Sequence, residues 1–155
     1  MRPVTAILSV AAIVLLTAGL IAQVKPSFAG EWKMAGDHVG PEGDLTITQN
    51  AATMTLEGGS QTPAPAKLTY RLDGSVSKNI VAARAGGTPT EQISKAMWVG
   101  NTLVVSTATT AGEEKRTFAI DGGDLVIEIS APARAGRAPT VTKVTFRTRI
   151  PGFGG

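Results

Sequence analysis

The residues that could do acid–base or metal chemistry are few, and they lie in one Gly/Pro-rich segment. His38 is the only histidine of the 155-residue chain, and Asp37 and Glu42 lie close to it in the sequence. An imidazole beside carboxylates can act as a general acid or base, or as part of a metal site. A single histidine among Gly and Pro residues is more typical of a solvated loop. A hydrolase or isomerase that uses His38 is therefore the weakest of three functional hypotheses.

Other catalytic chemistry has less support. The chain has no cysteine, which excludes disulfides, thiolate zinc sites and cysteine nucleophiles. No serine lies in a nucleophile elbow. Asp121 and Asp124 flank two glycines as in a calcium loop, but the spacing provides no further oxygen ligands, and a hairpin turn accounts for these residues. We therefore predict a protein that is not an enzyme and that uses no cofactor and no metal.

Three arginines are candidates for binding an acidic group. Arg84 lies in a segment rich in Gly and Ala, and Arg134 and Arg137 lie in a second segment of this kind. A guanidinium group can hold a carboxylate or a phosphate through two hydrogen bonds. The competing interpretation is that both segments are solvated loops, in which exposed charges contribute little.

The elements that must position these residues are predicted to be strands. After residue 30, apolar and polar residues alternate with a period of two in many short stretches, and threonine repeatedly occupies the polar positions. We predict ten strands, at about residues 28–34, 44–49, 52–57, 66–72, 75–83, 91–99, 102–109, 113–120, 124–130 and 139–150.

The connections between these strands alternate in length. The tight ones fall at residues 50–51, 73–74, 100–101 and 121–123. The longer ones fall at residues 35–43, 58–65, 84–90 and 131–138, and residues 110–112 are intermediate. Alternate connections of an up-and-down meander lie at opposite ends of the sheet. We therefore expect the tight turns at one end and the long loops at the other.

Closing the meander into an up-and-down antiparallel β-barrel of about eight to ten strands would remove both sheet edges. The positions expected to face inward are mostly aliphatic: Leu45, Ile47, Met54, Leu56, Leu68, Tyr70, Ile93, Met97, Leu103, Val105, Leu125, Ile127, Val144 and Phe146. Tyr70, Met97, Phe118 and Phe146 are the candidates for lining a ligand cavity. The same residues could instead simply fill the core.

The N-terminal residues have the pattern of a targeting segment. Arg2 precedes an apolar run over residues 4–22, as in a secretory signal peptide or an uncleaved membrane anchor. Cleavage could follow Ala22 or Ala29, and we favour Ala22 because Phe28 is expected to belong to the first strand. We therefore predict an exported protein, periplasmic or secreted, which contacts a membrane only if the leader is retained.

Three segments result from this division of the chain. Residues 1–22 form the signal peptide or anchor, residues 23–150 form the barrel, and residues 151–155 form a flexible tail. The formal net charge is only +3, and it falls by one without the leader. So small an excess argues against a dedicated nucleic-acid-binding protein.

The opening of the barrel region resembles a known family. Residues 28–33 read Phe-Ala-Gly-Glu-Trp-Lys, and this F-x-G-x-W-K pattern is similar to the first strand of lipocalins and fatty-acid-binding proteins. The recurring order of strand, Asp-Gly turn and Leu-led strand resembles small secreted bacterial lipocalin-like proteins. The segment 35–43 is too short for the helical lid of fatty-acid-binding proteins, and no helix follows the last strand.

The resemblance implies a calyx-like barrel that binds a small apolar molecule. It implies structural roles for Phe28, Gly30 and Trp32, with Trp32 packed across the closed end of the barrel. It also implies that Arg147, or alternatively Arg149, stacks on this indole.

Two functional hypotheses of different classes remain ahead of the His38 enzyme. The first is an exported lipocalin-like protein that binds or carries a small, lipid-like hydrophobic ligand, with the loop arginines near any acidic head group. The second is a non-enzymatic envelope interaction module whose barrel is filled and whose long loops bind a protein or a polysaccharide.

Overall fold

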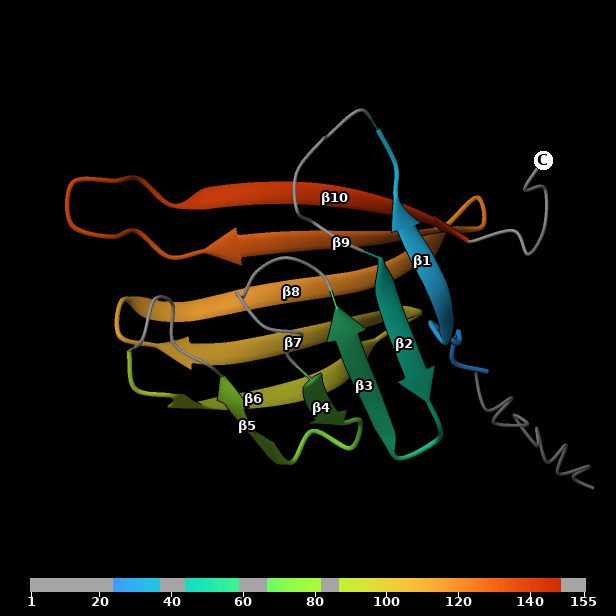
Figure 1. Ribbon diagram of the computed structural model, residues 1–155, viewed down its shortest axis with the longest axis horizontal. Helices are drawn as coiled ribbons and strands as arrows, with labels where there is room; N and C mark the ends of the chain where they lie inside the picture. The colour runs from blue at the N-terminus through green and yellow to red at the C-terminus, as the bar shows by residue number, and fades with distance from the viewer. Residues whose placement is uncertain (1–23, 37–43, 59–66, 82–86, 149–155) are drawn as a thin grey trace, which may run out of the picture.

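Ten β-strands make up the part of the chain that the structure describes (Figure 1). The computed structural model describes residues 24–36, 44–58, 67–81 and 87–148. The strands are β1 (Gly30–Met34), β2 (Leu45–Gln49), β3 (Thr53–Gly58), β4 (Lys67–Arg71), β5 (Val76–Val81), β6 (Thr90–Val99), β7 (Thr102–Thr109), β8 (Gly112–Asp121), β9 (Asp124–Ala131) and β10 (Thr140–Thr148). These residues include no helix long and apolar enough to cross a membrane. The predicted leader and tail lie outside the described residues.

The strands form one antiparallel sheet that curls into a nearly closed barrel. Their order in the sheet is β4-β3-β2-β1-β10-β9-β8-β7-β6-β5. Each strand pairs with its neighbour along the chain, except at β4 and β5, and β1 pairs with β10, so that the first and last strands meet. Figure 1 shows β1, β2 and β3 crossing the layer of β7 to β10 at a steep angle. The predicted up-and-down, all-β barrel is confirmed.

The barrel is closed at β4 and β5 by side chains in place of a backbone ladder. Asn79 on β5 accepts a hydrogen bond from the Thr69 amide at 2.8 Å and donates one to the Thr69 carbonyl at 3.0 Å. Ser77 Oγ accepts a hydrogen bond from the Arg71 amide at 2.8 Å. An amide side chain carries one acceptor and one donor, as a peptide group does. The Asn79 side chain therefore bonds both backbone groups of Thr69, as the backbone of a neighbouring strand would.

We expect Asn79→Ala to weaken this seam. The substitution leaves the amide and carbonyl of Thr69 without these partners, which costs about 1–3 kcal/mol of unfolding free energy. Hydrogen exchange of the Thr69 amide should accelerate at the same time. Lys78→Ala is the matched control, because Lys78 points outward and forms only an exposed ion pair with Glu91 at 3.2 Å. Unchanged protection at Thr69 in the Asn79 variant would contradict this account.

The connections alternate in length as predicted. Short turns join β2 to β3, β4 to β5, β6 to β7, and β8 to β9. The other five connections, which are β1–β2, β3–β4, β5–β6, β7–β8 and β9–β10, fall at the opposite end. We call these the short-turn end and the long-loop end. The β7–β8 connection is itself tight, because β7 ends at Thr109 and β8 begins at Gly112.

An aromatic cluster fills the short-turn end. Phe28 is completely buried, its ring stacks on Trp98 with centroids 5.7 Å apart, and it meets Phe118 at 6.1 Å. Gln49 holds the segment before β1 in place: its Oε1 accepts a hydrogen bond from the Phe28 amide at 2.8 Å, and its Nε2 donates one to the Pro26 carbonyl at 3.2 Å. Phe28 therefore belongs to the core, although it precedes β1.

Trp32 also lies in this cluster, as predicted, but its polar contacts differ from the expectation. The indole is 4% exposed, and its Nε1 donates a hydrogen bond to the Phe28 carbonyl at 2.8 Å. Gly30 has a φ of +150°, and a Cβ at this position would lie 3.5 Å from Trp32 Nε1. Glycine thus allows both the backbone conformation and the close approach of the indole.

The predicted stacking of Arg147 on Trp32 is wrong. Arg147 follows the inward-facing Phe146, so the alternation of the strand turns its side chain outward. The guanidinium side chain is 72% exposed and lies 3.8 Å from Asp124. The cation near an indole is instead Lys25, whose Nζ lies 5.8 Å from the centroid of Trp98. Arg149 lies outside the described residues.

Candidate functional site

The inward face of the barrel is the candidate site, and most of it is apolar. The buried core residues on the strands are Trp32, Leu45, Ile47, Met54, Leu56, Tyr70, Ala96, Leu103, Val105, Phe118, Leu125, Ile127 and Phe146. They come from every strand except β5, and they form one cluster with the aromatic residues of the short-turn end. An apolar molecule in this interior would therefore meet aliphatic and aromatic side chains.

The inward face of β5 to β8 changes character toward the long-loop end. Its residues there are polar, and we call them the interior polar band: Ser77, Asn79, Gln92, Ser94, Thr107, Glu114 and Arg116. The strand pairings bring them together, because Asn79 lies opposite Gln92, Ser77 opposite Ser94, and Thr107 between Ser94 and Glu114. The barrel interior is thus amphipathic, with an apolar half and a polar half.

Most groups of the interior polar band have partners. Ser94 and Thr107 are almost fully buried, and their hydroxyl oxygens lie 2.8 Å apart. Ser77 and Asn79 hydrogen-bond the backbone of β4. Gln92 Oε1 is the exception: it is buried and has no hydrogen-bond partner among the described residues. A buried acceptor without a partner is costly, so its presence beside the interior indicates a group that a ligand could satisfy.

The band contains one ion pair. Arg116 Nε donates to Glu114 Oε1 at 2.9 Å, and the two side chains are only 16% and 18% exposed. Both project inward from β8, because residues two apart in a strand share a face. On the other side of this strand, Lys115 and Glu113 form a solvent-exposed pair at 3.3 Å. The interior pair has no net charge, and the remaining N–H groups of Arg116 can still donate hydrogen bonds.

Tyr70 on β4 faces this ion pair. The residue is only 1% exposed. Burial raises the pKa of Tyr70 above its usual value of 10.0, the charge of Arg116 opposes that rise, and the charge of Glu114 adds to it. Tyr70 therefore stays a neutral phenol that can donate or accept a hydrogen bond.

We expect the fold to lose stability at alkaline pH through Tyr70. The pKa of its phenol is raised in the folded state, so the contribution of the neutral phenol is complete below about pH 10 and is lost as the pH rises through the folded-state pKa. Tyr70 is the only tyrosine of the chain, so the absorbance of the ionised phenol reports this residue alone. The measurement pairs that titration with urea unfolding between about pH 9 and pH 11.

Tyr70→Phe is the control for this titration. It keeps the ring and removes the ionisable hydroxyl, so the phenol-dependent loss of stability should disappear. A wild-type phenol that titrates at its usual pKa in the folded protein would contradict the burial of Tyr70.

The sequence predicted part of this site correctly. Tyr70, Phe118 and Phe146 face inward and are buried, as expected. Their role as ligand contacts stays a prediction, because residues that only fill the core would be buried to the same extent.

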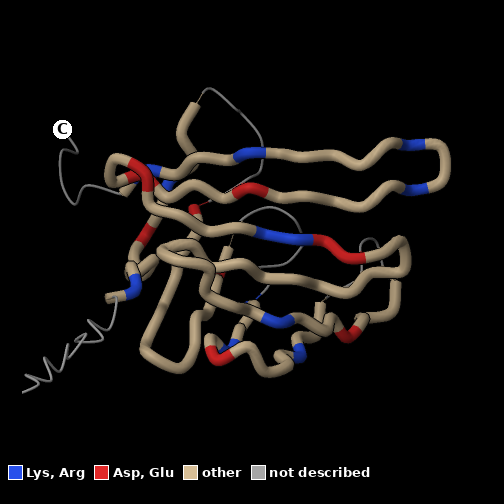
Figure 2. Tube along the Cα trace, turned by 180° about the vertical axis from the view of Figure 1, so that it is seen from behind, with Lys and Arg blue, Asp and Glu red and all other residues tan. Residues whose placement is uncertain are grey.

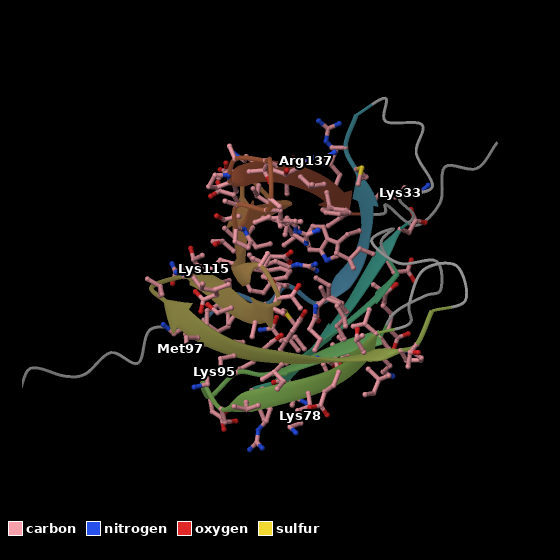
Figure 3. The ribbon with its side chains drawn as sticks, turned by 90° about the vertical axis from the view of Figure 1, so that its left-hand side faces the viewer. Lys33, Lys78, Lys95, Met97, Lys115 and Arg137 are labelled. Atoms are coloured by element: carbon pink, nitrogen blue, oxygen red, sulfur yellow. The ribbon has the colours of Figure 1, made fainter. Side chains whose placement is uncertain are left out.

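The predicted inward position of Met97 is wrong, and so is that of Ile93. Met97 is 57% exposed and Ile93 is 42% exposed. Figure 3 shows Met97, Lys95 and Lys78 on the outside of the wall formed by β5 and β6. The inward residues of β6 are Gln92, Ser94, Ala96 and Trp98. The predicted register of this strand was shifted by one residue, which exchanges its two faces.

Arg134 and Arg137 are not part of the interior polar band. Arg134 and Arg137 are exposed in the β9–β10 hairpin, where their amides and carbonyls bond to each other at 3.1 and 2.8 Å. Figure 2 shows basic residues at the tip of this hairpin and charges of both signs spread over the other strands. Arg84 and His38 lie outside the described residues. Anion binding by the three arginines therefore stays a prediction.

Gln92, Glu114 and Arg116 were not predicted from the sequence as site residues. Four charged residues follow one another at positions 113–116. In a barrel strand such a run must turn two of its charges inward, because successive side chains point to opposite faces. The run of four charges therefore predicts two charged side chains inside the barrel, but it does not show which two. The structure identifies the two residues. Phe118 pairs with Leu103 and faces inward, and Arg116 and Glu114 lie two and four positions before it, on the same face of the strand.

The acidic turn between β8 and β9 is a hairpin. Asp121 and Asp124 are paired across it, and Gly122 and Gly123 have φ values of +59° and +90°. Within the described residues no three His, Cys, Asp or Glu side chains are grouped so that they could hold a metal ion.

Several solved structures share this fold. No family model matches the chain, and no curated protein matches it. The wild-type fluorescent protein UnaG superposes with a TM-score of 0.56 at 21% identity, over 79% of this chain and 97% of that chain. A point mutant of UnaG gives 0.57 at 20% identity, over 79% and 96%.

A zebrafish ileal bile acid-binding protein, complexed with cholic acid, has the same architecture. Its TM-score is 0.53 at 18% identity, over 79% of this chain and 98% of that chain. These structures are calycins of the fatty-acid-binding-protein type. At such low identity the likeness establishes the fold alone, and it covers nearly the whole of each of these proteins.

Proposed function

We propose that this chain is an exported protein that binds a small hydrophobic molecule inside its barrel. The observation that carries the proposal is the amphipathic interior, in which an apolar cluster meets a polar band with an unpaired buried oxygen at Gln92. Such an interior, apolar with a few placed polar groups, is typical of small-molecule sites. The likeness to a bile acid-binding protein that was solved with cholic acid supports the same function.

The geometry favours a ligand with its apolar part toward the short-turn end. The aromatic residues Phe28, Trp32 and Phe118 lie there, whereas Glu114 and Arg116 lie toward the long-loop end. Burial of apolar surface would supply most of the binding free energy. Arg134 and Arg137 are exposed at the same end as the polar band, where they could meet an acidic group that protrudes from the barrel.

For the proposed export, the position of Phe28 favours cleavage after Ala22 over cleavage after Ala29. Cleavage after Ala29 would remove a side chain that is completely buried and that stacks on Trp98. A mature chain beginning at residue 23 would keep the whole aromatic cluster. The mass of the secreted or periplasmic form tests this proposal directly.

The binding function is tested with an apolar fluorophore. The purified full chain is extracted with organic solvent and then titrated with the uncharged fluorophore N-phenyl-1-naphthylamine, with displacement by a long-chain alcohol. Saturable binding that is displaced is the expected result. No saturable binding and no extracted lipid would overturn the proposal and would favour the interaction module with a filled barrel.

A further inference from the structure

The charge of the barrel interior bears on which class of ligand it accepts. Among the strand residues that the structure describes, the charged ones on inward positions are Glu114 and Arg116. Glu114 Oε1 already occupies Arg116 Nε at 2.9 Å. The inward wall therefore carries one positive and one negative charge, and the positive charge is already balanced.

We propose that the interior selects a neutral amphipathic ligand that carries a hydroxyl group over the corresponding free carboxylic acid; this inference rests on the ligand-binding function proposed above. A ligand carboxylate would bring a second negative charge to a pair that is already neutral. Transferring this charge from water into the barrel would cost desolvation free energy. Arg116 would offset only part of that cost, because its guanidinium group already pairs with Glu114. Glu114 would also repel the carboxylate.

A hydroxyl matches the buried oxygen of Gln92, which has no hydrogen-bond partner among the described residues. Gln92 Oε1 is buried and needs a donor. The Tyr70 hydroxyl is neutral and buried, and it faces the ion pair. An alcohol can donate one hydrogen bond and accept two, and it leaves the charge balance of the band unchanged. An ionised acid can only accept hydrogen bonds, so it cannot satisfy Gln92 Oε1.

Dodecanol and dodecanoate provide the test, because they share an alkyl chain and differ in the head group. Both compete with the bound fluorophore at neutral pH in the full-length protein. We expect dodecanol to displace the fluorophore at a concentration lower by at least about tenfold, which is the effect of one poorly compensated charge at a partly buried site.

Glu114→Gln is the decisive variant. It keeps the shape of the side chain, removes the negative charge and leaves Arg116 unbalanced, so the affinity for dodecanoate should rise by about tenfold and the preference for dodecanol should shrink by the same factor. Glu113→Gln is the matched control: this neighbour lies on the outer face and pairs with Lys115, so the wild-type preference should persist.

A double variant, Glu114→Gln with Arg116→Gln, keeps the test informative if the single variant does not fold. It removes both charges, and dodecanol should again be preferred. Wild-type protein that binds dodecanoate as tightly as dodecanol, or a Glu114→Gln variant with unchanged preference, would overturn the inference. Those results leave the proposed function intact, whereas absence of saturable fluorophore binding would defeat the proposed function itself.

Discussion

Phe28→Ala is expected to lower the free energy of unfolding by about 3–5 kcal/mol, the range found when a buried aromatic side chain is truncated to alanine. Phe28 is 0% exposed, and it contacts the rings of Trp98 and Phe118. Removal of the ring would leave a space between β6, β8 and the start of β1 that the closed barrel cannot easily collapse. Urea unfolding monitored by tryptophan fluorescence measures the loss, because one of the two tryptophans is the stacked neighbour.

Val24→Ala is the control for this truncation. Val24 belongs to the same N-terminal segment but is 90% exposed, so its truncation should change stability by less than about 0.5 kcal/mol. A loss below about 1 kcal/mol for Phe28→Ala would mean that the segment before β1 detaches easily and that the aromatic cluster does not depend on it. That outcome would also remove the argument for cleavage after Ala22.

The strand pattern was predictable because this chain has strong local signals for it. In β2, Leu45 and Ile47 alternate with threonines, and the structure buries the two apolar residues and exposes the two threonines. Short turns between β6 and β7 and between β8 and β9 contain Gly, Asn or Asp, which adopt the necessary backbone conformations. Alternation and turn chemistry together determine a meander, and a meander of ten strands closes to remove its edges.

The faces of β6 were not predictable in the same way. Ile93, Met97 and Val99 make one face the more hydrophobic, and the sequence analysis placed that face inward. The structure turns it outward, because Trp98 reaches Phe28 and Ser94 reaches Thr107 on the other side. Hydrophobicity identifies the inward face only where the interior is apolar, and the interior beside β6 is polar. Local pattern cannot reveal this, since the polarity of that region depends on residues from four strands.

The polar groups of the site lie on the strands, whereas the residues predicted from the sequence lie in the loops. Arg84, Arg134 and Arg137 were chosen because charged loop residues at an open end can reach a ligand. Arg116 and Glu114 are better positioned for ligand selectivity, because their side chains are mostly buried and their geometry is fixed by a paired strand. Charges in an interior act with less screening than charges on a loop, so they discriminate more strongly between a neutral and an ionised ligand.

Gly58→Ala is the second substitution with a large expected effect, and it acts through the backbone. Gly58 ends β3 and pairs with Leu45 at the start of β2. It has a φ of +88°, a region that is costly for any residue with a Cβ, and a Cβ built there would clash with the Asp44 carbonyl oxygen. No side-chain rotation relieves that contact, because the backbone fixes the position of a Cβ and the Asp44 oxygen is itself a backbone atom. The start of β2 or the end of β3 must therefore move.

We expect Gly58→Ala to cost at least about 3 kcal/mol, of which the strained backbone conformation alone accounts for about 1–3 kcal/mol. Gly100→Ala separates the two contributions, since Gly100 has a φ of +60° but nothing lies within 4 Å of a Cβ built there. Gly100→Ala should therefore show only the conformational cost, and the difference between the two variants in urea unfolding measures the close approach to Asp44. Equal losses of unfolding free energy in the two variants would mean that β2 and β3 can move apart at this point without a cost in stability. A larger loss at Gly58 would show that the close approach to the Asp44 carbonyl adds to the conformational cost.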